Sequence, residues 1–327
     1  MAELSTNRAL RSKAVAYTGV GGLEVIQVVE REVRAPAANE VRVEVKAAAV
    51  SPTDLLLRDP NFRSNLVAPA APPTLLVPGM DLAGVVEAVG PGVSRLRPGY
   101  KVMAVVWPRR PEGGAYAQHV VAPAASVVRI PEGLSFAQAS TLPMNGLTAL
   151  LALELAALER GQVLAVSGGA GLLAHFAIAA AKRQGIKVIA DARASEKALV
   201  ESYGANIVVE RGADFAGAIR KELPSGADAL LDTAVLGEKS FGALRDGGVY
   251  IPVRGWGDQP AERAIQIKPV FVFGVLKRTE WLEQLSDWVS RGYIEPLVAG
   301  EYAPEQAGDA QNALAAGGLR GRPVIVF

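Results

Sequence analysis

Glycines suited to binding a dinucleotide phosphate lie near the middle of the chain. The strand-like run Val163–Ser167 leads directly into Gly168-Gly169-Ala170-Gly171, and a helical stretch follows from Leu172. Strand, glycine turn and helix are the context in which this spacing predicts a pyrophosphate site, with Ala174 tolerated in the third glycine slot. The glycines let backbone N–H groups approach the phosphates, and the start of the helix adds donors and partial positive charge. The expected phosphate-binding residues are Gly168, Gly169, Ala170, Gly171, Leu172 and Leu173.

The end of the following strand indicates which dinucleotide the turn favours. Asp191-Ala192-Arg193 lies roughly 20 residues past the glycines, where such sites meet the adenosine ribose. An acid there accepts hydrogen bonds from an unphosphorylated ribose, whereas a basic side chain favours a 2′-phosphate. The sequence carries both, so these residues alone leave NADH and NADPH open.

Composition excludes several other chemistries. The chain has no cysteine and only two histidines, His119 and His175, so we expect no disulfide, thiolate nucleophile or metal site. Its 34 basic and 33 acidic side chains create no overall field for nucleic acid or an anionic membrane. No signal-peptide pattern follows Met1 to Lys13, and no apolar run reaches the ~20 residues of a spanning helix. We therefore expect a cytoplasmic protein with a small-molecule substrate.

Length and hydrophobic pattern predict two domains, because 327 residues exceed one ordinary domain. Between Lys13 and Ile130 many short strand-like segments alternate with turn signals, and Glu40–Val45 alternates strictly between polar and apolar residues. This pattern predicts a barrel-like β domain. Asp59 to Pro78 contains five prolines, so we expect a long, functional loop there.

Near Ser135 the pattern changes to alternating strands and helices. The strand candidates are Val163–Ser167, Lys187–Asp191, Asn206–Val209, Ala229–Asp232 and Val249–Val253. Such alternation predicts a parallel, doubly wound sheet. A sixth strand is expected at Val270–Val275, where unpaired backbone groups at the sheet edge would favour association with another chain.

Six stretches spread over nearly the whole chain match one family in its order. They are Ala47–Asp54, Val77–Val86, Gly113–Ala117, Leu142–Ala149, Ser167–Ala174 and Gly321–Val326. They resemble the medium-chain dehydrogenase/reductase superfamily, and within it the zinc-independent quinone oxidoreductase and enoyl reductase branch. The resemblance implies a GroES-like β-barrel catalytic domain over residues 1–130, completed by 277–327, and a Rossmann NADP-binding domain over 131–276. It also implies a homodimer in which the strand Val270–Val275 pairs with its copy.

The resemblance extends to cofactor residues. In NAD-dependent members the discriminating acid falls at the slot of Ala192, and similar NADPH enzymes hold the 2′-phosphate near Arg193 and Lys197. We therefore expect NADPH, the alternative being that both are solvated surface charges. Further positions match residues that line the nicotinamide pocket of similar enzymes, although each also fits a plain core role. These are Thr148, Val253, Phe273, Gly274 and Val275.

Two departures from the family bear on the chemistry. Zinc-containing relatives have cysteine where this chain has Ser51, and their Gly-His-Glu signature reads Gly79-Met80-Asp81 here. We therefore expect no catalytic zinc. Alcohol oxidation must stabilise an alkoxide, which a Lewis-acid metal does. Hydride addition to a conjugated acceptor gives a delocalised phenolate or enolate that needs only modest hydrogen bonding.

Few side chains are candidates for this chemistry. Ser51 and Asp54 are the candidate catalytic residues, although a carboxylate at that place also serves to hold its loop. Similar quinone oxidoreductases carry a tyrosine where this chain has Leu55 to Leu57, so no phenolic proton donor is evident. The candidate substrate-pocket residues are Trp107, Arg109, Arg254 and Trp256, which also fit surface or lid roles.

The sequence thus predicts an NADPH-dependent oxidoreductase that transfers hydride to a quinone or an α,β-unsaturated carbonyl. Two alternatives stay open. One is a trans-acting enoyl-thioester reductase of a biosynthetic pathway, and the other is a non-catalytic NADPH-binding sensor or structural protein. A zinc-free alcohol dehydrogenase ranks last.

Overall fold

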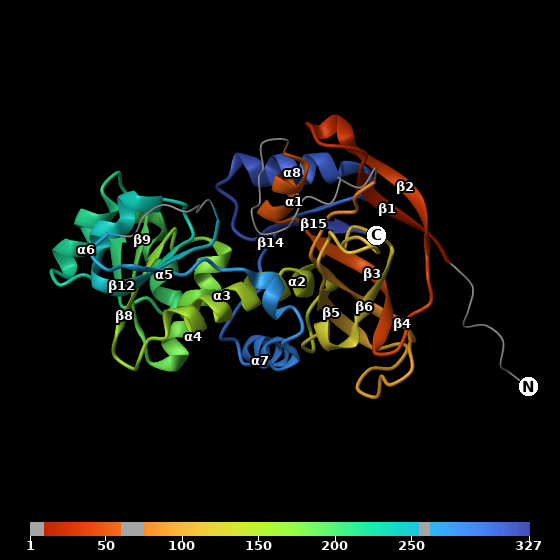
Figure 1. Cartoon of the computed structure of the whole chain (residues 1–327), viewed down its shortest axis with the longest axis horizontal. Helices are drawn as coiled ribbons and strands as arrows, with labels where there is room; N and C mark the ends of the chain where they lie inside the picture. Colours follow the sequence, from red (N-terminus) through yellow and green to blue (C-terminus); the bar gives the residue numbers. More distant parts are fainter. Residues whose placement is uncertain (1–9, 60–74, 255–261) are drawn as a thin grey trace, which may run out of the picture. The chain divides into compact units, whose positions relative to one another are not determined.

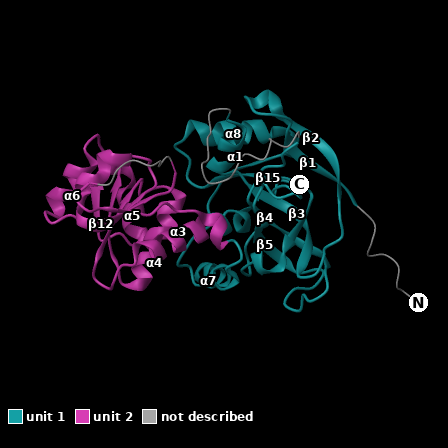
Figure 2. Cartoon of the chain, in the orientation of Figure 1, with its two compact units in different colours: residues 1–144, 276–327 teal, residues 145–275 magenta. Residues whose placement is uncertain are grey.

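The chain divides into two compact units (Figures 1 and 2). The computed structural model describes residues 10–59, 75–254 and 262–327. Unit 1 comprises residues 1–144 and 276–327, and unit 2 comprises residues 145–275. In the part of the chain that the structure describes, no helix is long and apolar enough to cross a membrane.

Unit 1 is built around a sheet of seven strands. Their order is β14-β15-β3-β4-β5-β7, and β6 pairs with β3. The strands are β3 Glu40–Ala49, β4 Asp81–Val89, β5 Lys101–Val105, β6 His119–Pro123, β7 Val127–Arg129, β14 Val298–Tyr302 and β15 Arg322–Val326. Strand β3 shows how the sequence makes the core, because its polar and apolar residues alternate and Val41, Val43 and Val45 are buried.

A second, two-stranded sheet completes the β structure of unit 1. Its strands, β1 Leu10–Tyr17 and β2 Ile26–Val33, pair antiparallel and are joined through the 3₁₀-helix η1, Leu23–Val25. The helices of the unit are α1 Pro52–Arg58, α2 Phe136–Ser140, α7 Thr279–Ser290 and α8 Ala307–Ala316, with η2 Ala124–Ser126 and η6 Pro304–Gln306. Helices α1 and α8 lie side by side (Figure 1).

Unit 2 contains a parallel six-stranded sheet with the order β10-β9-β8-β11-β12-β13. The strands are β8 Val163–Ser167, β9 Lys187–Ala192, β10 Ile207–Glu210, β11 Ala227–Asp232, β12 Leu244–Pro252 and β13 Gln266–Ile267. The helices are α3 Pro143–Ala156, which begins in unit 1, α4 Leu172–Gln184, α5 Lys197–Tyr203 and α6 Phe215–Glu222, with η3 Ala194–Glu196, η4 Gly237–Ala243 and η5 Val272–Val275. The expected doubly wound sheet is confirmed, with the order reversing between β8 and β11.

The expectation of a sixth strand at Val270–Val275 is wrong. The outermost strand is the two-residue β13, and Val272–Val275 forms the 3₁₀-helix η5. Pro269 follows β13 closely and has no N–H for the ladder. Gly274 favours a turn over extended pairing, and its amide donates to the carbonyl oxygen of Phe271 at 3.1 Å.

The boundary between the units falls later in the sequence than the expected start of the cofactor domain at residue 131. Residues 131–144 belong to unit 1. The physical reason is α2, which packs against β3, β4 and β5. Its buried residues are Ala137, Ala139 and Ser140, and a capping box between Ser135 and Gln138 fixes where it begins.

Candidate functional site

The glycine turn between β8 and α4 has a shape that side chains would disrupt. Gly168 has φ +72°, and a Cβ atom on it would stand 2.7 Å from Oγ1 of Thr233. A Cβ atom on Gly169 would stand 2.7 Å from the backbone oxygen of Asp191. Only glycine fits these two positions without a shift of the backbone.

The start of α4 supplies donors for an anionic group. Its N-cap residue, Gly171, has no side chain to cap the helix, so the first amides, those of Leu172 and Leu173, donate to no capping side chain there. The aligned peptide dipoles of this thirteen-residue helix also place partial positive charge at its N-terminal end. The turn and helix start could therefore hold the pyrophosphate of a dinucleotide, and this assignment stays a prediction.

Asp191, near the end of β9, holds the glycine turn in place. Its Oδ1 accepts a hydrogen bond from the Gly168 N–H at 2.5 Å, and its Oδ2 accepts one from Nε of Arg211 at 2.8 Å. The Gly169 N–H donates to the main-chain oxygen of Asp191 at 3.0 Å. Each carboxylate oxygen thus binds a group of the protein, and the Asp191 side chain is only 8% exposed, so little of it is offered to an unphosphorylated ribose.

The two basic residues singled out from the sequence lie on the exposed segment after β9. Arg193 is exposed and precedes η3, where its N–H donates to Oε2 of Glu196 at 3.3 Å. Lys197 begins α5, and its Nζ lies 3.9 Å from Oε1 of Glu201. Both remain candidates for the 2′-phosphate.

A buried polar network fixes the ends of β8, β11 and β12, where the strand order reverses. Oδ1 of Asp232 accepts from the Ser167 hydroxyl at 2.6 Å, and its Oδ2 accepts from the Tyr250 hydroxyl at 2.7 Å. The Thr233 hydroxyl donates to the main-chain oxygen of Ser167. This network sets the position of Thr233 against Gly168, at the edge of the sheet where doubly wound folds bind ligands.

The residues expected beside the nicotinamide lie in different elements of unit 2. Thr148 is a buried residue of α3, and Val253 follows β12 directly. Phe273, Gly274 and Val275 belong to η5, in which Phe273 is exposed and Val275 is buried. Their assignment to a nicotinamide pocket stays a prediction.

In unit 1 the candidate Asp54 is buried and surrounded by donors. Its Oδ2 accepts from the Ser51 N–H at 2.8 Å and from the Tyr116 hydroxyl at 2.9 Å, and its Oδ1 accepts from the Gly79 N–H at 2.9 Å. Burial raises the pKa of Asp54 to about 6, and the three donors oppose that rise. These contacts give Asp54 the loop-holding role that the sequence left open beside catalysis.

Ser51 differs from Asp54 because its hydroxyl has no partner. Ser51 precedes α1 as its N-cap, and its Oγ atom is buried without a hydrogen bond to the described residues. The carboxylate half of a capping box is formed by Asp54, whereas the hydroxyl half is not. Ser51 therefore keeps an unused donor and acceptor.

Asp81 is a buried carboxyl group that sequence reasoning treated only as part of a lost zinc signature. It starts β4, and its Oδ1 accepts from the Met144 N–H at 2.7 Å. Its Oδ2 is buried with no partner among the described residues. Burial raises the pKa of Asp81 well above its usual range, and the nearby charge of Asp54 adds to this. No spacing rule pointed to this residue, because its partner lies 63 positions away in sequence.

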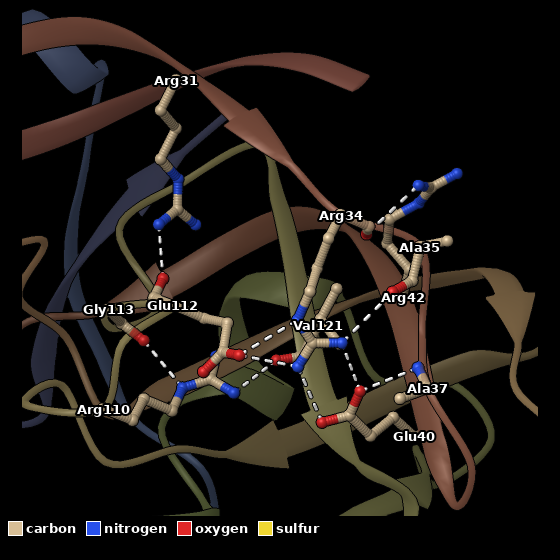
Figure 3. Close-up of polar contacts among 10 residues, drawn as sticks. All are labelled: Arg31, Arg34, Ala35, Ala37, Glu40, Arg42, Arg110, Glu112, Gly113 and Val121. Carbon is tan, nitrogen blue, oxygen red and sulfur yellow. Dashed lines mark hydrogen bonds and ion pairs between the residues drawn. The ribbon is translucent and has the colours of Figure 1, made fainter. Parts of the chain in front are cut away.

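The candidate pocket residues of unit 1 lie on a loop after β5 that arginines anchor. Trp107 is half-buried and Arg109 is exposed. Nε of Arg110 donates to the Gly113 oxygen at 2.8 Å, and Arg31 donates to the main-chain oxygen of Glu112 (Figure 3). The loop is therefore tied to β2 through Arg31 and braced internally by Arg110.

The same loop joins an ion-pair network. Arg34 lies between two carboxylates, with Nη2 2.6 Å from Oε1 of Glu112 and Nη1 hydrogen-bonded to Glu40 (Figure 3). The neighbouring Arg110 is largely buried, and this burial lowers its pKa to about 10. Of the two remaining pocket candidates, Arg254 is exposed after β12, and Trp256 lies outside the described residues.

Comparison with known families places both parts of the chain. Residues 37–132 match the model described as "Alcohol dehydrogenase GroES-like domain", and residues 203–325 match the one described as "Zinc-binding dehydrogenase". The 2-methylene-furan-3-one reductase of Solanum lycopersicum is 30% identical over 99% of this chain and 82% of its own length. This chain belongs to the medium-chain dehydrogenase/reductase superfamily of oxidoreductases.

Two further relatives cover nearly the whole chain. The chloroplastic NADPH-dependent alkenal/one oxidoreductase of Arabidopsis thaliana is 28% identical over 96% of this chain and 79% of its own length. The quinone oxidoreductase of Sus scrofa is 27% identical over 99% of this chain and 100% of its own length.

Solved structures agree with the fold. An alcohol dehydrogenase superfamily protein from Novosphingobium aromaticivorans superposes with a TM-score of 0.83 at 26% identity, over 97% of this chain and 99% of that one. A structure titled NAD-dependent alcohol dehydrogenase superposes with a TM-score of 0.80 at 26% identity, over 96% of this chain and 99% of that one. One relative is named as NADPH-dependent and one solved structure as NAD-dependent. The fold therefore does not decide which of the two cofactors binds, and that choice depends on side chains.

The description of the second family model implies zinc, but the residues of this chain do not fit that metal. Ser51 and Met80 stand where zinc-containing relatives have cysteine and histidine. The oxygens of Asp54 already accept three hydrogen bonds from the protein. Among the residues that the structure describes, no three His, Cys, Asp or Glu side chains gather into a group able to hold a metal ion.

Proposed function

We propose that this chain is an NADPH-dependent reductase that transfers a hydride to a conjugated acceptor, a quinone or an α,β-unsaturated carbonyl, without zinc. The observation that carries the proposal is the glycine turn, whose Gly168 amide is held by Asp191 and whose next helix begins without a side-chain cap. Relatives named NADPH-dependent alkenal/one oxidoreductase and quinone oxidoreductase support the substrate class.

The residues of unit 2 give the cofactor its binding contacts in this proposal. The backbone of Gly168 to Leu173 binds the pyrophosphate, and Thr148, Val253 and η5 line the nicotinamide pocket. Arg193 and Lys197 favour the 2′-phosphate, because Asp191 is already engaged by the protein. When bound, NADPH supplies the hydride.

The residues of unit 1 suit a conjugated acceptor better than an alcohol. Without a Lewis acid, an alkoxide has no strong stabiliser, whereas an enolate or phenolate needs only hydrogen bonding. Ser51 is proposed for that purpose, because its buried hydroxyl has no hydrogen-bond partner in the part of the chain that the structure describes. Trp107 and Arg109 stand on the anchored loop as contacts for the substrate, and Arg254 and Trp256 are proposed with them.

Stopped-flow loss of NADPH absorbance tests the proposal. The panel contains a quinone, an enone and an enoyl-CoA ester, with a simple ketone and its alcohol as controls. We expect rapid oxidation by at least one conjugated acceptor and none by the ketone. If NADPH binds but no acceptor oxidises it, the chain is a binding protein rather than a reductase. Preference for the enoyl ester would identify the enoyl-thioester reductase.

We also propose a homodimer and a cytoplasmic location. The rings of Phe271 and Phe273 lie tilted against each other, with centroids 5.8 Å apart, shortly after the outermost described strand β13, and Phe273 is exposed, which favours burial by a second copy. A cytoplasmic location would give the enzyme access to NADPH. Sedimentation equilibrium tests the dimer, and a monomer that persists at the highest concentrations would contradict it.

A further inference from the structure

A backbone hydrogen bond positions Arg211 close to the glycine turn. It follows β10, and its N–H donates to the main-chain oxygen of Ala192, at the end of β9, at 2.8 Å. Its side chain then reaches Asp191, and Nη2 lies 3.5 Å from where a Cβ atom of Gly168 would stand. The guanidinium group is thus beside the first glycine of the turn.

Only one edge of this guanidinium group is used by the protein. Nε binds Oδ2 of Asp191 at 2.8 Å, and the two Nη groups make no hydrogen bond to the described residues. The Arg211 side chain is 37% exposed, whereas the Asp191 side chain is 8% exposed. A ligand that approaches this point therefore meets the guanidinium group of Arg211, whereas the carboxylate of Asp191 is largely buried.

The Asp191–Arg211 pair affects the binding of NADH and of NADPH in opposite ways. The slot at which NAD-dependent members are expected to carry the discriminating acid holds Ala192 here, and the nearest carboxylate is that of Asp191, one residue earlier. If that carboxylate were free, it would repel a 2′-phosphate and favour the ribose hydroxyls of NADH. Here each oxygen of Asp191 already accepts a hydrogen bond from the protein, and Arg211 neutralises the charge of the carboxylate. Because the Asp191 side chain is only 8% exposed, it offers little to a ribose hydroxyl. Arginine binds phosphate well because its Nη groups form parallel hydrogen bonds.

We propose that Asp191 and Arg211 act as one selectivity pair, in which Arg211 keeps Asp191 from the ribose hydroxyls and offers its free Nη groups to the 2′-phosphate. This inference rests on the proposed NADPH dependence and adds Arg211 as the residue that determines it. Arg193 and Lys197 then have a secondary part, because they lie on the exposed segment beyond the strand.

Binding of cofactor fragments tests the pair without any turnover. Isothermal titration calorimetry compares 2′,5′-ADP with 5′-AMP for the wild type, Arg211→Gln, Arg211→Lys and Arg193→Gln. Arg245→Gln is the matched control, because Nε of Arg245 binds Oδ1 of Asp228 at the same 2.8 Å near the opposite ends of the strands. The melting temperature of each variant reports whether it is folded.

We expect Arg211→Gln to lower the ratio of the two affinities by about tenfold or more, as loss of a charged hydrogen bond does. Arg211→Lys should restore part of the ratio, and Arg245→Gln should leave it unchanged. An unchanged ratio in Arg211→Gln, or an equal loss in Arg193→Gln, would overturn the inference while leaving NADPH dependence intact. A wild type that binds 5′-AMP as tightly as 2′,5′-ADP would instead overturn the proposed NADPH dependence.

Discussion

The carboxyl group of Asp81 accepts a hydrogen bond from the backbone N–H of Met144 at 2.7 Å, in the first turn of α3. The same carboxyl group leaves Oδ2 buried without a partner among the described residues. It therefore accepts a hydrogen bond from an amide in the first turn of a helix, at the cost of keeping an acid group away from water.

This contact predicts how stability depends on pH. Because the pKa of Asp81 is raised in the folded chain, its contribution is fully present below the unfolded pKa and is lost as pH rises through the folded pKa. Asp81→Asn keeps an oxygen for Met144 and removes the titration. The variant should gain in unfolding free energy relative to the wild type as pH rises above about 4, measured by urea unfolding.

Asp81→Ala is the comparison for that experiment. It removes the acceptor for Met144, so it should lose about 1–3 kcal/mol of unfolding free energy at low pH, where the wild-type carboxyl group carries no charge. A constant difference between Asp81→Asn and the wild type at every pH would contradict the raised pKa.

Tyr116→Phe should weaken the hold on Asp54 in a pH-dependent way. The Tyr116 hydroxyl donates to Oδ2 of Asp54, and this bond is stronger when the carboxyl group is ionised, above its pKa of about 6. We expect a loss of about 1–2 kcal/mol at about pH 8 and a smaller loss at about pH 5. Urea unfolding at both pH values measures it.

Tyr17→Phe is the matched control, because the Tyr17 hydroxyl donates to the main-chain oxygen of Asp54 at 2.9 Å rather than to the carboxylate. Its cost should be similar at both pH values. If the two variants respond to pH alike, the Tyr116 bond does not stabilise the ionised form of Asp54.

Ser51→Ala separates packing from catalysis. Since the Ser51 Oγ atom is buried without a partner, its removal should change the unfolding free energy by less than about 1 kcal/mol. If the hydroxyl assists the developing enolate, kcat should fall roughly tenfold or more while the KM for NADPH is kept. A large loss of stability would show that Ser51 holds the loop, and an unchanged kcat would remove it from the chemistry.

Gly168→Ala should damage cofactor binding and stability together. The new Cβ atom would stand 2.7 Å from Oγ1 of Thr233, at a backbone φ of +72° that alanine rarely adopts. We expect a loss of about 1–3 kcal/mol in unfolding free energy and weaker 2′,5′-ADP binding. Gly19→Ala is the control, because nothing lies within 4 Å of its Cβ position and its φ is not positive. Equal effects from the two changes would contradict the account of the turn.

Local pattern predicted much of the fold. The glycines and the strand before them predicted the β8–turn–α4 unit. The alternation of strand-like and helical segments predicted five of the six strands of the doubly wound sheet. The sixth did not, because a two-residue strand has too few positions to show a period and Pro269 interrupts the apolar run behind it. For this reason the strand that was expected to pair with its copy at Val270–Val275 is absent, and Val272–Val275 forms a 3₁₀-helix instead.

Contacts between distant segments could not be read from the sequence. Asp191 looked like a ribose ligand because of its distance from the glycines, yet its oxygens face Gly168 and Arg211. Arg211 was missed because its relevance depends on β10 lying beside β9. Asp54 is the opposite case, since the sequence already offered it a loop-holding role, and the backbone N–H groups of Ser51 and Gly79 donate to its carboxylate.

The most direct test of the central claim follows the hydride itself. NADPH deuterated at C4 of the nicotinamide is oxidised by the purified chain with an enone, and the product is analysed by mass spectrometry and NMR. The account predicts deuterium on the carbon β to the carbonyl, with the carbonyl group retained. Deuterium on the carbonyl carbon, giving an alcohol, or no transfer to any conjugated acceptor, would contradict it.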